Sequence, residues 1–356
     1  MTKSVSCEHA TASDSRQPRT FRDIGLRVFT TCQQSTRSAP EEYARQVATL
    51  AGWSEDVGCE GMLVYTDNSL VDPWLVAQLI IEHTETLAPL VAVQPIYMHP
   101  YTVAKMVSSL AFLHRRRIWL NLVAGGFRLD LDALADPTPH DERYDRLVEY
   151  GRVITALLES GKRLTFEGRY YSVKSLALSP SLPEDLMPGM TVSGSSAAGR
   201  SAASLLGATS IKYPQRFEEE EVQAVSKSER LGMRCGVIAR ESDEQAWDVA
   251  FRRFPVDRKG QLKHGLAMQV SDSQWHRQLA ELGRQEAAEH SVYWLGPFEN
   301  YKTFCPYLVG SYERVGRELG RYLSIGFRTF ILDIPPSREE LQHSVLAFAR
   351  AAHGTS

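Results

Sequence analysis

The stretch RIWLNLVAGG, residues 117–126, decides the fold class of this chain. Its first seven residues form a nearly continuous apolar run rich in β-branched and aromatic side chains, which predicts a strand buried on both faces of a parallel sheet. The run ends in Ala124, Gly125 and Gly126, where a backbone with little or no side chain lets a flat ligand approach closely. The stretch therefore predicts a buried parallel strand whose carboxyl end borders a ligand site.

The segment that follows predicts a helix with two ring side chains on one face. We expect Thr138 to be its N-cap, with Pro139 at the first helical position and Asp141 completing a capping box. The spacing of four residues then places His140 and Tyr144 on the same face of the helix.

Strand-like and helix-like segments alternate along the rest of the chain, which indicates repeated βα units. Such a series in a single chain of 356 residues favours a closed (β/α)8 TIM barrel over an open doubly wound sheet. We expect strands at residues 26–31, 61–65, 89–94, 117–123, 190–193, 209–213, 233–240 and 328–333, and helices at residues 40–57, 72–83, 101–113, 141–160, 197–206, 217–231, 243–254 and 338–352.

The barrel is expected to form a single domain, residues 23–354. Residues 1–22 are polar and lack periodicity, so we expect a mobile N-terminal arm. Two insertions interrupt the series, at about residues 161–189, with a hairpin expected at 163–173, and at about residues 255–310. The second insertion is polar and long, which suggests a solvated lid over the mouth of the barrel.

Composition and charge exclude several classes of protein. The formal net charge of -3, without a basic stripe, argues against nucleic-acid binding. No apolar run approaches the roughly 18 residues of a membrane span, and the polar N-terminus lacks the apolar core of a signal peptide, so we expect a cytoplasmic protein without membrane contact. The 5 cysteines form no CxxC pair and the histidines form no HExxH motif, so we expect packing thiols and no metal site.

A run of small and hydroxyl residues after the fifth strand outlines a phosphate cradle. Ser193, Gly194, Ser195 and Ser196 stand at the start of a helix, where free N–H groups and the helix dipole favour an anion. An ordinary N-cap with small residues is an equal alternative. Tyr144 could add a hydroxyl donor to the same phosphate.

Simple structural roles remain open for the residues at the start of the fourth helix. Tyr144 shares an apolar stripe with Leu147 and Val148 and could belong to the core. His140 could have no role beyond complementing a turn, and Arg143 could be a solvated charge.

Together these segments resemble the luciferase-like flavin monooxygenases, and within them the alkanesulfonate monooxygenase branch. The resemblance covers nearly the whole barrel and rests on the order and spacing of its motifs. These are DPWLVA at 72–77, NLVAG at 121–125, DERY at 141–144, FEGRYY at 166–171 and SGSS at 193–196.

The resemblance implies that Tyr144, Ser195 and Ser196 hold the phosphate of FMN and that Asn121 and Ala124 lie beside its isoalloxazine ring. With His140, Ser193 and Gly194 from the same segments, these residues are the predicted cofactor-binding set.

The resemblance also implies reduced FMN as a diffusible cosubstrate, a separate flavin reductase that supplies it, and O2 activation at the flavin C4a position. No GxGxxG motif follows a strand, so the sequence shows no nicotinamide site of its own.

The sequence departs from the sulfonate branch where specificity would be set. The cysteine of that branch falls at Leu70 and its strand histidine at Gly236, while the insertion arginine is replaced around Tyr301 and Lys302, and a tyrosine is replaced by Pro335. A simple alkanesulfonate would lose most of its partners, so we expect a different organic substrate.

Two residues are the catalytic candidates. Arg234 matches the strand arginine of the family, and an arginine on a barrel strand needs a ligand or a partner, so it could bind an anion or stabilise a peroxide. A structural pair with a carboxylate of a neighbouring strand is an equal alternative. Asp67 ends the second strand. It could act as a base, or its role could be limited to shaping a turn. Aromatic residues at 293–307 could line an apolar pocket or pack the insertion onto the barrel.

The sequence thus predicts a two-component, FMN-dependent monooxygenase acting on a small-molecule or carrier-linked substrate. A deazaflavin-dependent oxidoreductase on the same barrel and a non-catalytic flavin-binding barrel are the alternatives. By the resemblance, and from the apolar helices at 72–81 and 101–113, we expect a homodimer or homotetramer.

Overall fold

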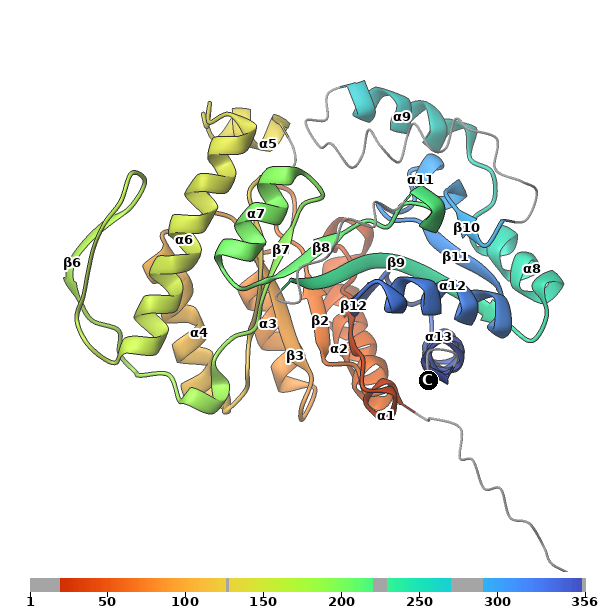
Figure 1. Cartoon of the computed structure of the whole chain (residues 1–356), viewed down its shortest axis with the longest axis horizontal. Coiled ribbons are helices and arrows are strands. Elements are labelled where there is room, and N and C mark those ends of the chain that lie inside the picture. The colour runs from red at the N-terminus through yellow and green to blue at the C-terminus, as the bar shows by residue number, and fades with distance from the viewer. Residues whose placement is uncertain (1–19, 126–127, 220–228, 270–290, 354–356) are drawn as a thin grey trace, which may run out of the picture.

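The computed structural model describes residues 20–125, 128–219, 229–269 and 291–353. Its central feature is a closed barrel of parallel strands, which confirms the predicted (β/α)8 fold (Figure 1). Around the barrel the strands follow the order β1 (Arg27–Thr31), β2 (Gly61–Val64), β3 (Ala88–Val93), β4 (Trp119–Val123), β7 (Met190–Ser193), β8 (Thr209–Lys212), β9 (Arg230–Arg240) and β12 (Phe327–Leu332).

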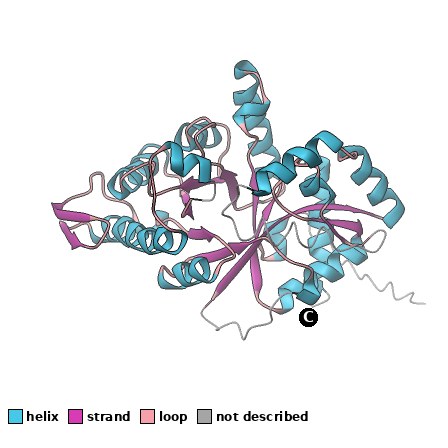
Figure 2. Cartoon of the chain, turned by 90° about the horizontal axis from the view of Figure 1, so that it is seen from above, coloured by secondary structure: helices cyan, strands magenta, loops and turns pink. Residues whose placement is uncertain are grey.

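Strand β9 closes the barrel because it pairs in parallel with both β8 and β12. Its carboxyl half continues beyond the barrel and pairs with β11 (Tyr307–Ser311), which in turn pairs antiparallel with β10 (Tyr293–Trp294). An antiparallel hairpin of β5 (Leu164–Glu167) and β6 (Ser172–Leu176) confirms the one expected in the first insertion, and it projects at the left of Figures 1 and 2.

Helices surround the strands, as Figure 2 shows from above. The longer ones are α2 (Pro40–Asp56), α3 (Pro73–Glu82), α4 (Pro100–His114), α6 (His140–Ser160), α7 (Ala197–Leu205), α8 (Asp243–Arg253), α9 (Arg258–Gln269), α12 (Tyr312–Ser324) and α13 (Arg338–His353). Shorter helical turns are α1 (Phe21–Ile24), α5 (Arg128–Ala133), α11 (Gly296–Glu299), η1 (Ser35–Arg37), η2 (Glu184–Leu186) and η3 (Phe217–Glu219). Among the described helices, none is both long and apolar enough to span a membrane.

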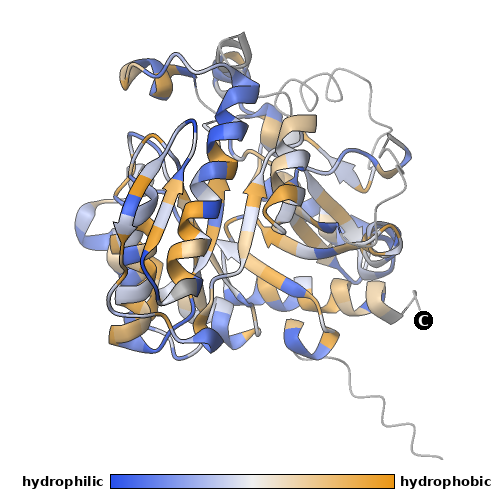
Figure 3. Ribbon diagram, turned by 60° about the vertical axis from the view of Figure 1, so that its left-hand side comes forward, coloured by the Kyte–Doolittle hydropathy of each residue, from blue (hydrophilic) through white to orange (hydrophobic). Residues whose placement is uncertain are grey.

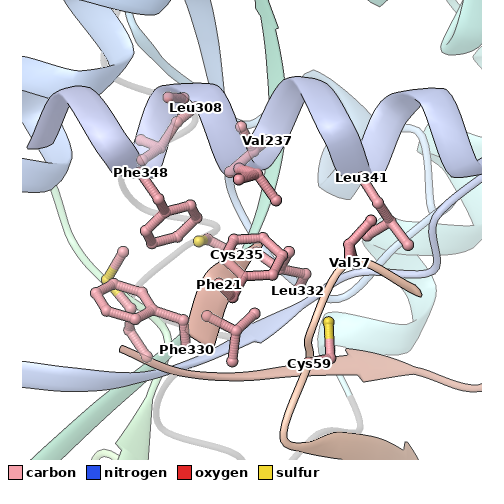
Figure 4. Packing of buried hydrophobic residues seen from close by; sticks show 14 of the residues in the cluster. Phe21, Val57, Cys59, Cys235, Val237, Leu308, Phe330, Leu332, Leu341 and Phe348 are labelled. Atoms are coloured by element: carbon pink, nitrogen blue, oxygen red, sulfur yellow. The ribbon is translucent and has the colours of Figure 1, made fainter. Parts of the chain in front are cut away.

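Apolar side chains fill the space on both sides of the strands. Inside the barrel, Phe29, Leu90, Trp119 and Ile331 belong to one buried cluster, whose rings Phe29 and Trp119 meet edge to face at 5.3 Å. Between the strands and α13 a larger cluster contains Phe21 and Phe348 (Figure 4). Figure 3 accordingly shows the strands mostly in orange and many outer helical turns in blue.

Several element boundaries differ from the expectation. Phe21, which we placed in the mobile arm, starts α1 and is fully buried, whereas residues 1–19 of that arm lie outside the described residues. The helix expected at 217–231 is wrong at its end, since Leu231 lies in β9, and residues 220–228 are not described.

The second insertion also differs from a wholly solvated segment. Its end forms β11, in which Tyr307, Leu308 and Val309 are buried. No helix or strand was expected at residues 311–327, yet α12 lies there and packs on α13. Residues 270–290, the middle of the expected lid, lie outside the described residues.

At the amino-terminal end of the barrel, Glu55 anchors the loop before β3. Its carboxylate accepts hydrogen bonds from the backbone N–H groups of Glu85, Thr86 and Leu87. Burial tends to raise the pKa of Glu55, but these donors outweigh it and lower the pKa below its usual value.

We expect Glu55→Gln to lower the free energy of unfolding by about 1 kcal/mol near neutral pH, because the neutral amide is a weaker acceptor. The depressed pKa means that the carboxylate stabilises the fold above its unfolded-state pKa and ceases to do so as the pH falls through its folded-state pKa. Urea unfolding at a series of pH values should therefore show that the free energies of unfolding of the variant and the native protein converge as the pH falls. Glu41→Gln, an exposed position in the same helix, is the control and should change little.

Candidate active site

A cavity of about 200 Å³ lies at the carboxyl ends of the barrel strands. Every site residue predicted from the sequence lines it. These are Asp67, Asn121, Ala124, His140, Tyr144, Ser193, Gly194, Ser195, Ser196 and Arg234. Their convergence from β2, β4, α6, β7, α7 and β9 is what the barrel geometry implies, since the carboxyl ends of its strands share one face.

The predicted phosphate cradle is a tight backbone turn between β7 and α7. A Cβ at Gly194 would lie 2.2 Å from the hydroxyl oxygen of Tyr144, so only glycine lets this tyrosine reach the turn. A Cβ at Gly199 would lie 3.0 Å from the carbonyl oxygen of Gly194, which explains the small residue at that point of the helix. The two glycines thus bring the hydroxyl of α6 and the start of α7 to one spot.

Of the two expectations for the serines of the cradle, the N-cap is confirmed, and the binding of a phosphate stays a prediction. Ser196 is the N-cap of α7, and its hydroxyl accepts a hydrogen bond from the N–H of Gly199 at 3.1 Å. The hydroxyl of Ser195 is buried and has no hydrogen-bond partner among the described residues. A buried donor beside a helix N-terminus fits the phosphate of a flavin, which would satisfy it.

Two arginines add positive charge around the cradle. Arg200 donates from its guanidinium to the carbonyl oxygen of Ser195 at 2.9 Å. Arg143 lines the cavity with 4% of its surface exposed and donates to the carbonyl oxygen of Thr138 at 3.1 Å, so the interpretation of Arg143 as a solvated charge is wrong. Both charges favour an anionic group at the cradle.

The start of α6 is built differently from the expected capping box. The N-cap is Pro139, without a side-chain cap, and Thr138 instead bonds to the carboxylate of Asp136. Arg146 reaches back to the same carboxylate at 2.6 Å and closes this loop. His140 and Tyr144 share a face as predicted, with ring centroids 5.3 Å apart.

The end of β4 forms a polar wall of the cavity. The side-chain oxygen of Asn121 accepts from the hydroxyls of Thr191 at 2.7 Å and Ser193 at 2.9 Å, so its amide nitrogen is the end that can donate to a ligand. Gly125 has φ +107°, and a Cβ there would lie 3.3 Å from the side-chain oxygen of Gln94. The same Cβ would lie 2.9 Å from Leu131, so the positive φ and the close packing explain the glycine, and the approach of a flat group to this strand end stays a prediction.

Arg234 lies at the opposite wall with 5% of its surface exposed. Its guanidinium donates to the hydroxyl of Tyr65 and, at 3.3 Å, to that of Tyr213, and it pairs with Asp333 at 3.5 Å. The other carboxylate oxygen of Asp333 accepts from Thr303 at 2.6 Å and Tyr307 at 2.8 Å. The structural pair considered for Arg234 therefore exists, and the same arginine faces the cavity.

Comparisons with known proteins show the family of this chain. The family model described as luciferase-like monooxygenase matches residues 25–329. The chain belongs to the luciferase-like monooxygenase family.

A monooxygenase from Niallia circulans, named 4-(gamma-L-glutamylamino)butanoyl-[BtrI acyl-carrier protein] monooxygenase BtrO, is 35% identical over 324 residues, which cover 89% of this chain and 93% of that protein. Two solved structures share the fold. A riboflavin lyase (RcaE) with modified FMN has a TM-score of 0.72 at 18% identity, covering 93% of this chain and 92% of its own. An F420-dependent secondary alcohol dehydrogenase has a TM-score of 0.59 at 15% identity, covering 91% and 98%.

In this luciferase-like monooxygenase Asp67 shapes a turn. One of its carboxylate oxygens accepts from both the N–H and the hydroxyl of Ser69 at 2.7 Å. The carboxylate also faces the cavity near Asp130, whose pKa is raised by burial and by the charge of Asp67. The turn role is thus present, and a role as a base stays a prediction.

The positions that differ from the sulfonate branch lie elsewhere in the described structure. Leu70 and Pro335 do not line the cavity. Gly236 faces Tyr307 behind the barrel wall, where a Cβ would lie 2.2 Å from the ring, and Lys302 pairs with Asp257 at 2.6 Å.

Several residues that line the cavity were not among the predicted site residues. Tyr65, Gln94 and Tyr213 each stand directly after a barrel strand, so the rule that strand ends carry the site could have found them. Gln34 and Tyr97 lie on loops and Asp130 lies in the short helix α5, and the sequence offers no such signal for these three residues.

Proposed function

We propose that this protein is the oxygenase of a two-component system that uses reduced FMN and O2 to oxidise an acyl group linked to a carrier. A separate flavin reductase would deliver the reduced FMN. The observation that carries the proposal is the cradle, in which Gly194 leaves room for the Tyr144 hydroxyl beside the partnerless Ser195 hydroxyl. The acyl-carrier substrate in the name of the 35% identical relative supports the carrier-linked class.

One wall of the cavity would bind the cofactor and the other would face the substrate. Ser195, Ser196 and the first N–H groups of α7 would hold the phosphate, while Asn121 and Ala124 would border the flavin ring. Burial raises the pKa of Tyr144, so its hydroxyl stays protonated. It donates to the carbonyl oxygen of Ser193 at the long distance of 3.5 Å and would donate to the phosphate instead when FMN is bound. When bound, reduced FMN supplies the electrons for oxygen activation.

Arg234 and Asp67 would serve the substrate side. Burial raises the pKa of Tyr65, and its oxygen already accepts from Arg234, so its own proton is the one to donate to a ligand. Apolar residues Leu63, Ala92 and Ile331 form the floor and limit the access of water.

Oligomerisation belongs to the same proposal. Leu75 on α3 and Phe112 and Leu113 on α4 are large apolar residues that are exposed in the single chain. A homodimer or homotetramer would cover them.

Oxygen incorporation tests the proposed function. The protein is mixed with photoreduced FMN, 18O2 and the BtrI acyl-carrier protein loaded with the 4-(gamma-L-glutamylamino)butanoyl group, and the acyl product is analysed by mass spectrometry. We expect substrate-dependent oxygen consumption and a product that carries one 18O atom.

Two parallel samples separate the alternatives. Oxidation of reduced F420 by the same substrate, without 18O in the product, would show a deazaflavin-dependent oxidoreductase. Tight binding of FMN, with neither reaction, would identify a non-catalytic flavin-binding barrel.

A further inference from the structure

Helix α9 carries two different faces, and its inner face packs on the barrel side of the insertion. A Cβ at Gly260 would lie 2.1 Å from the carbonyl oxygen of Asn300, and the ring of His264 meets that of Phe298 at 4.5 Å. Asp257 caps the helix by accepting from the N–H of Gly260 at 2.9 Å. The inner face is therefore occupied.

The outer face of α9 is basic and apolar at once. Arg258, Lys259, Leu262 and Lys263 fall within one side of the helix and are exposed, Leu262 to 73%. Val256, just before the helix, is 77% exposed. No ion pair joins these basic side chains to an acid within residues 20–125, 128–219, 229–265 and 291–353. We call these five residues the α9 face.

A chain of aromatic contacts connects α9 to the active-site cavity. His264 lies 6.1 Å from Tyr301, and Tyr301 lies 6.1 Å from Phe304, measured between ring centroids. Phe304 lines the cavity. In Figure 1, α9 lies on the same upper side as α5, whose Asp130 also lines the cavity.

We infer that the α9 face docks an acidic carrier protein, which presents its tethered acyl group to the cavity. This inference rests on the proposed carrier-linked substrate. A tethered group enters the cavity while the protein that bears it stays outside, so the carrier must rest beside the mouth.

The charge of the chain makes a local basic surface necessary for such a partner. The formal net charge is -3, so an acidic protein is repelled on average and needs a positive patch to approach. The basic residues of the α9 face supply that patch. Val256 and Leu262 supply the apolar centre that protein interfaces combine with a polar rim.

Charge reversal tests the α9 face directly. The variant is Arg258→Glu/Lys259→Glu/Lys263→Glu, and the probe is the BtrI acyl-carrier protein bearing its acyl group. The control, Arg152→Glu/Lys162→Glu/Lys174→Glu, makes the same charge change on exposed residues of α6, of the turn that follows it and of β6, elements that lie far from α9 in Figure 1.

We expect the control to bind the carrier about as tightly as the native protein, apart from the loss of affinity that the changed net charge causes in both variants. At low salt the α9 variant should bind the carrier at least about tenfold more weakly than the control. The difference should shrink as salt screens the charges. With a pantetheine-linked acyl group that has no carrier protein, KM should be the same for all three proteins.

Several outcomes would overturn the docking inference. These are equal carrier affinity of the α9 variant and the control, no carrier binding by the native protein at low salt, and a loss confined to the transfer of reduced FMN from the reductase. Carrier binding with the expected pattern but without oxygen consumption would instead contradict the proposed function and leave the docking surface in place.

Discussion

Replacing Gly194 by alanine is expected to weaken flavin binding at least about 100-fold, which corresponds to about 2.7 kcal/mol. The added Cβ would lie 2.2 Å from the hydroxyl oxygen of Tyr144, so either the tyrosine or the turn before α7 must move. Moving either one separates the hydroxyl from the serines of the cradle. Fluorescence titration of FMN with the purified variant measures the loss.

Gly52→Ala is the matched control. Gly52 lies in α2, and a Cβ there has no atom within 4 Å, so both flavin affinity and thermal stability should be retained. Native flavin affinity in Gly194→Ala would contradict the assignment of this turn as the phosphate cradle. Unfolding of the variant would be revealed by circular dichroism, and Tyr144→Phe, which adds no atoms, then tests the same cradle with a loss of several-fold.

The barrel could be predicted from the sequence because its strands carry a strong local signal. Runs such as residues 118–123 are apolar apart from Asn121, and each is followed by an amphipathic helix. β11 could not be predicted because it lies within a polar insertion, and its pairing with β9 is a long-range contact that no local pattern reveals. α12 follows it with Val315, Leu319 and Leu323 at helical spacing, a signal that was present in the sequence.

In the candidate site, too, the features with a local sequence signal could be predicted and those that depend on long-range contacts could not. Glycines and hydroxyls after β4 and β7 could be identified from their places at strand ends. A solvated charge stayed open as an alternative for Arg143 because helical period alone does not reveal which side of the helix faces the cavity. A carboxylate partner for Arg234 was an open alternative, but the sequence could not show that Asp333, Tyr65 and Tyr213 meet there, because they follow three different strands.

Arg234→Met is expected to lower the free energy of unfolding by about 3–5 kcal/mol. The substitution leaves Asp333, which is 9% exposed, as a buried carboxylate without its cation. Thr303 and Tyr307 still donate to it but do not neutralise its charge. We also expect kcat/KM to fall at least about 100-fold, because a positive group at the cavity wall is lost. Urea unfolding and steady-state kinetics measure the two effects.

The double variant Arg234→Met/Asp333→Asn separates the two roles of the arginine. Asparagine at 333 can still accept from Thr303 and Tyr307, and without a buried charge most of the lost stability should return. A purely structural arginine predicts that kcat/KM returns with it. We expect the fold to recover while kcat/KM stays low, because Arg234 faces the cavity beside Tyr65 and acts on the bound substrate as well as on Asp333. Recovery of both in the double variant would assign Arg234 to the scaffold alone.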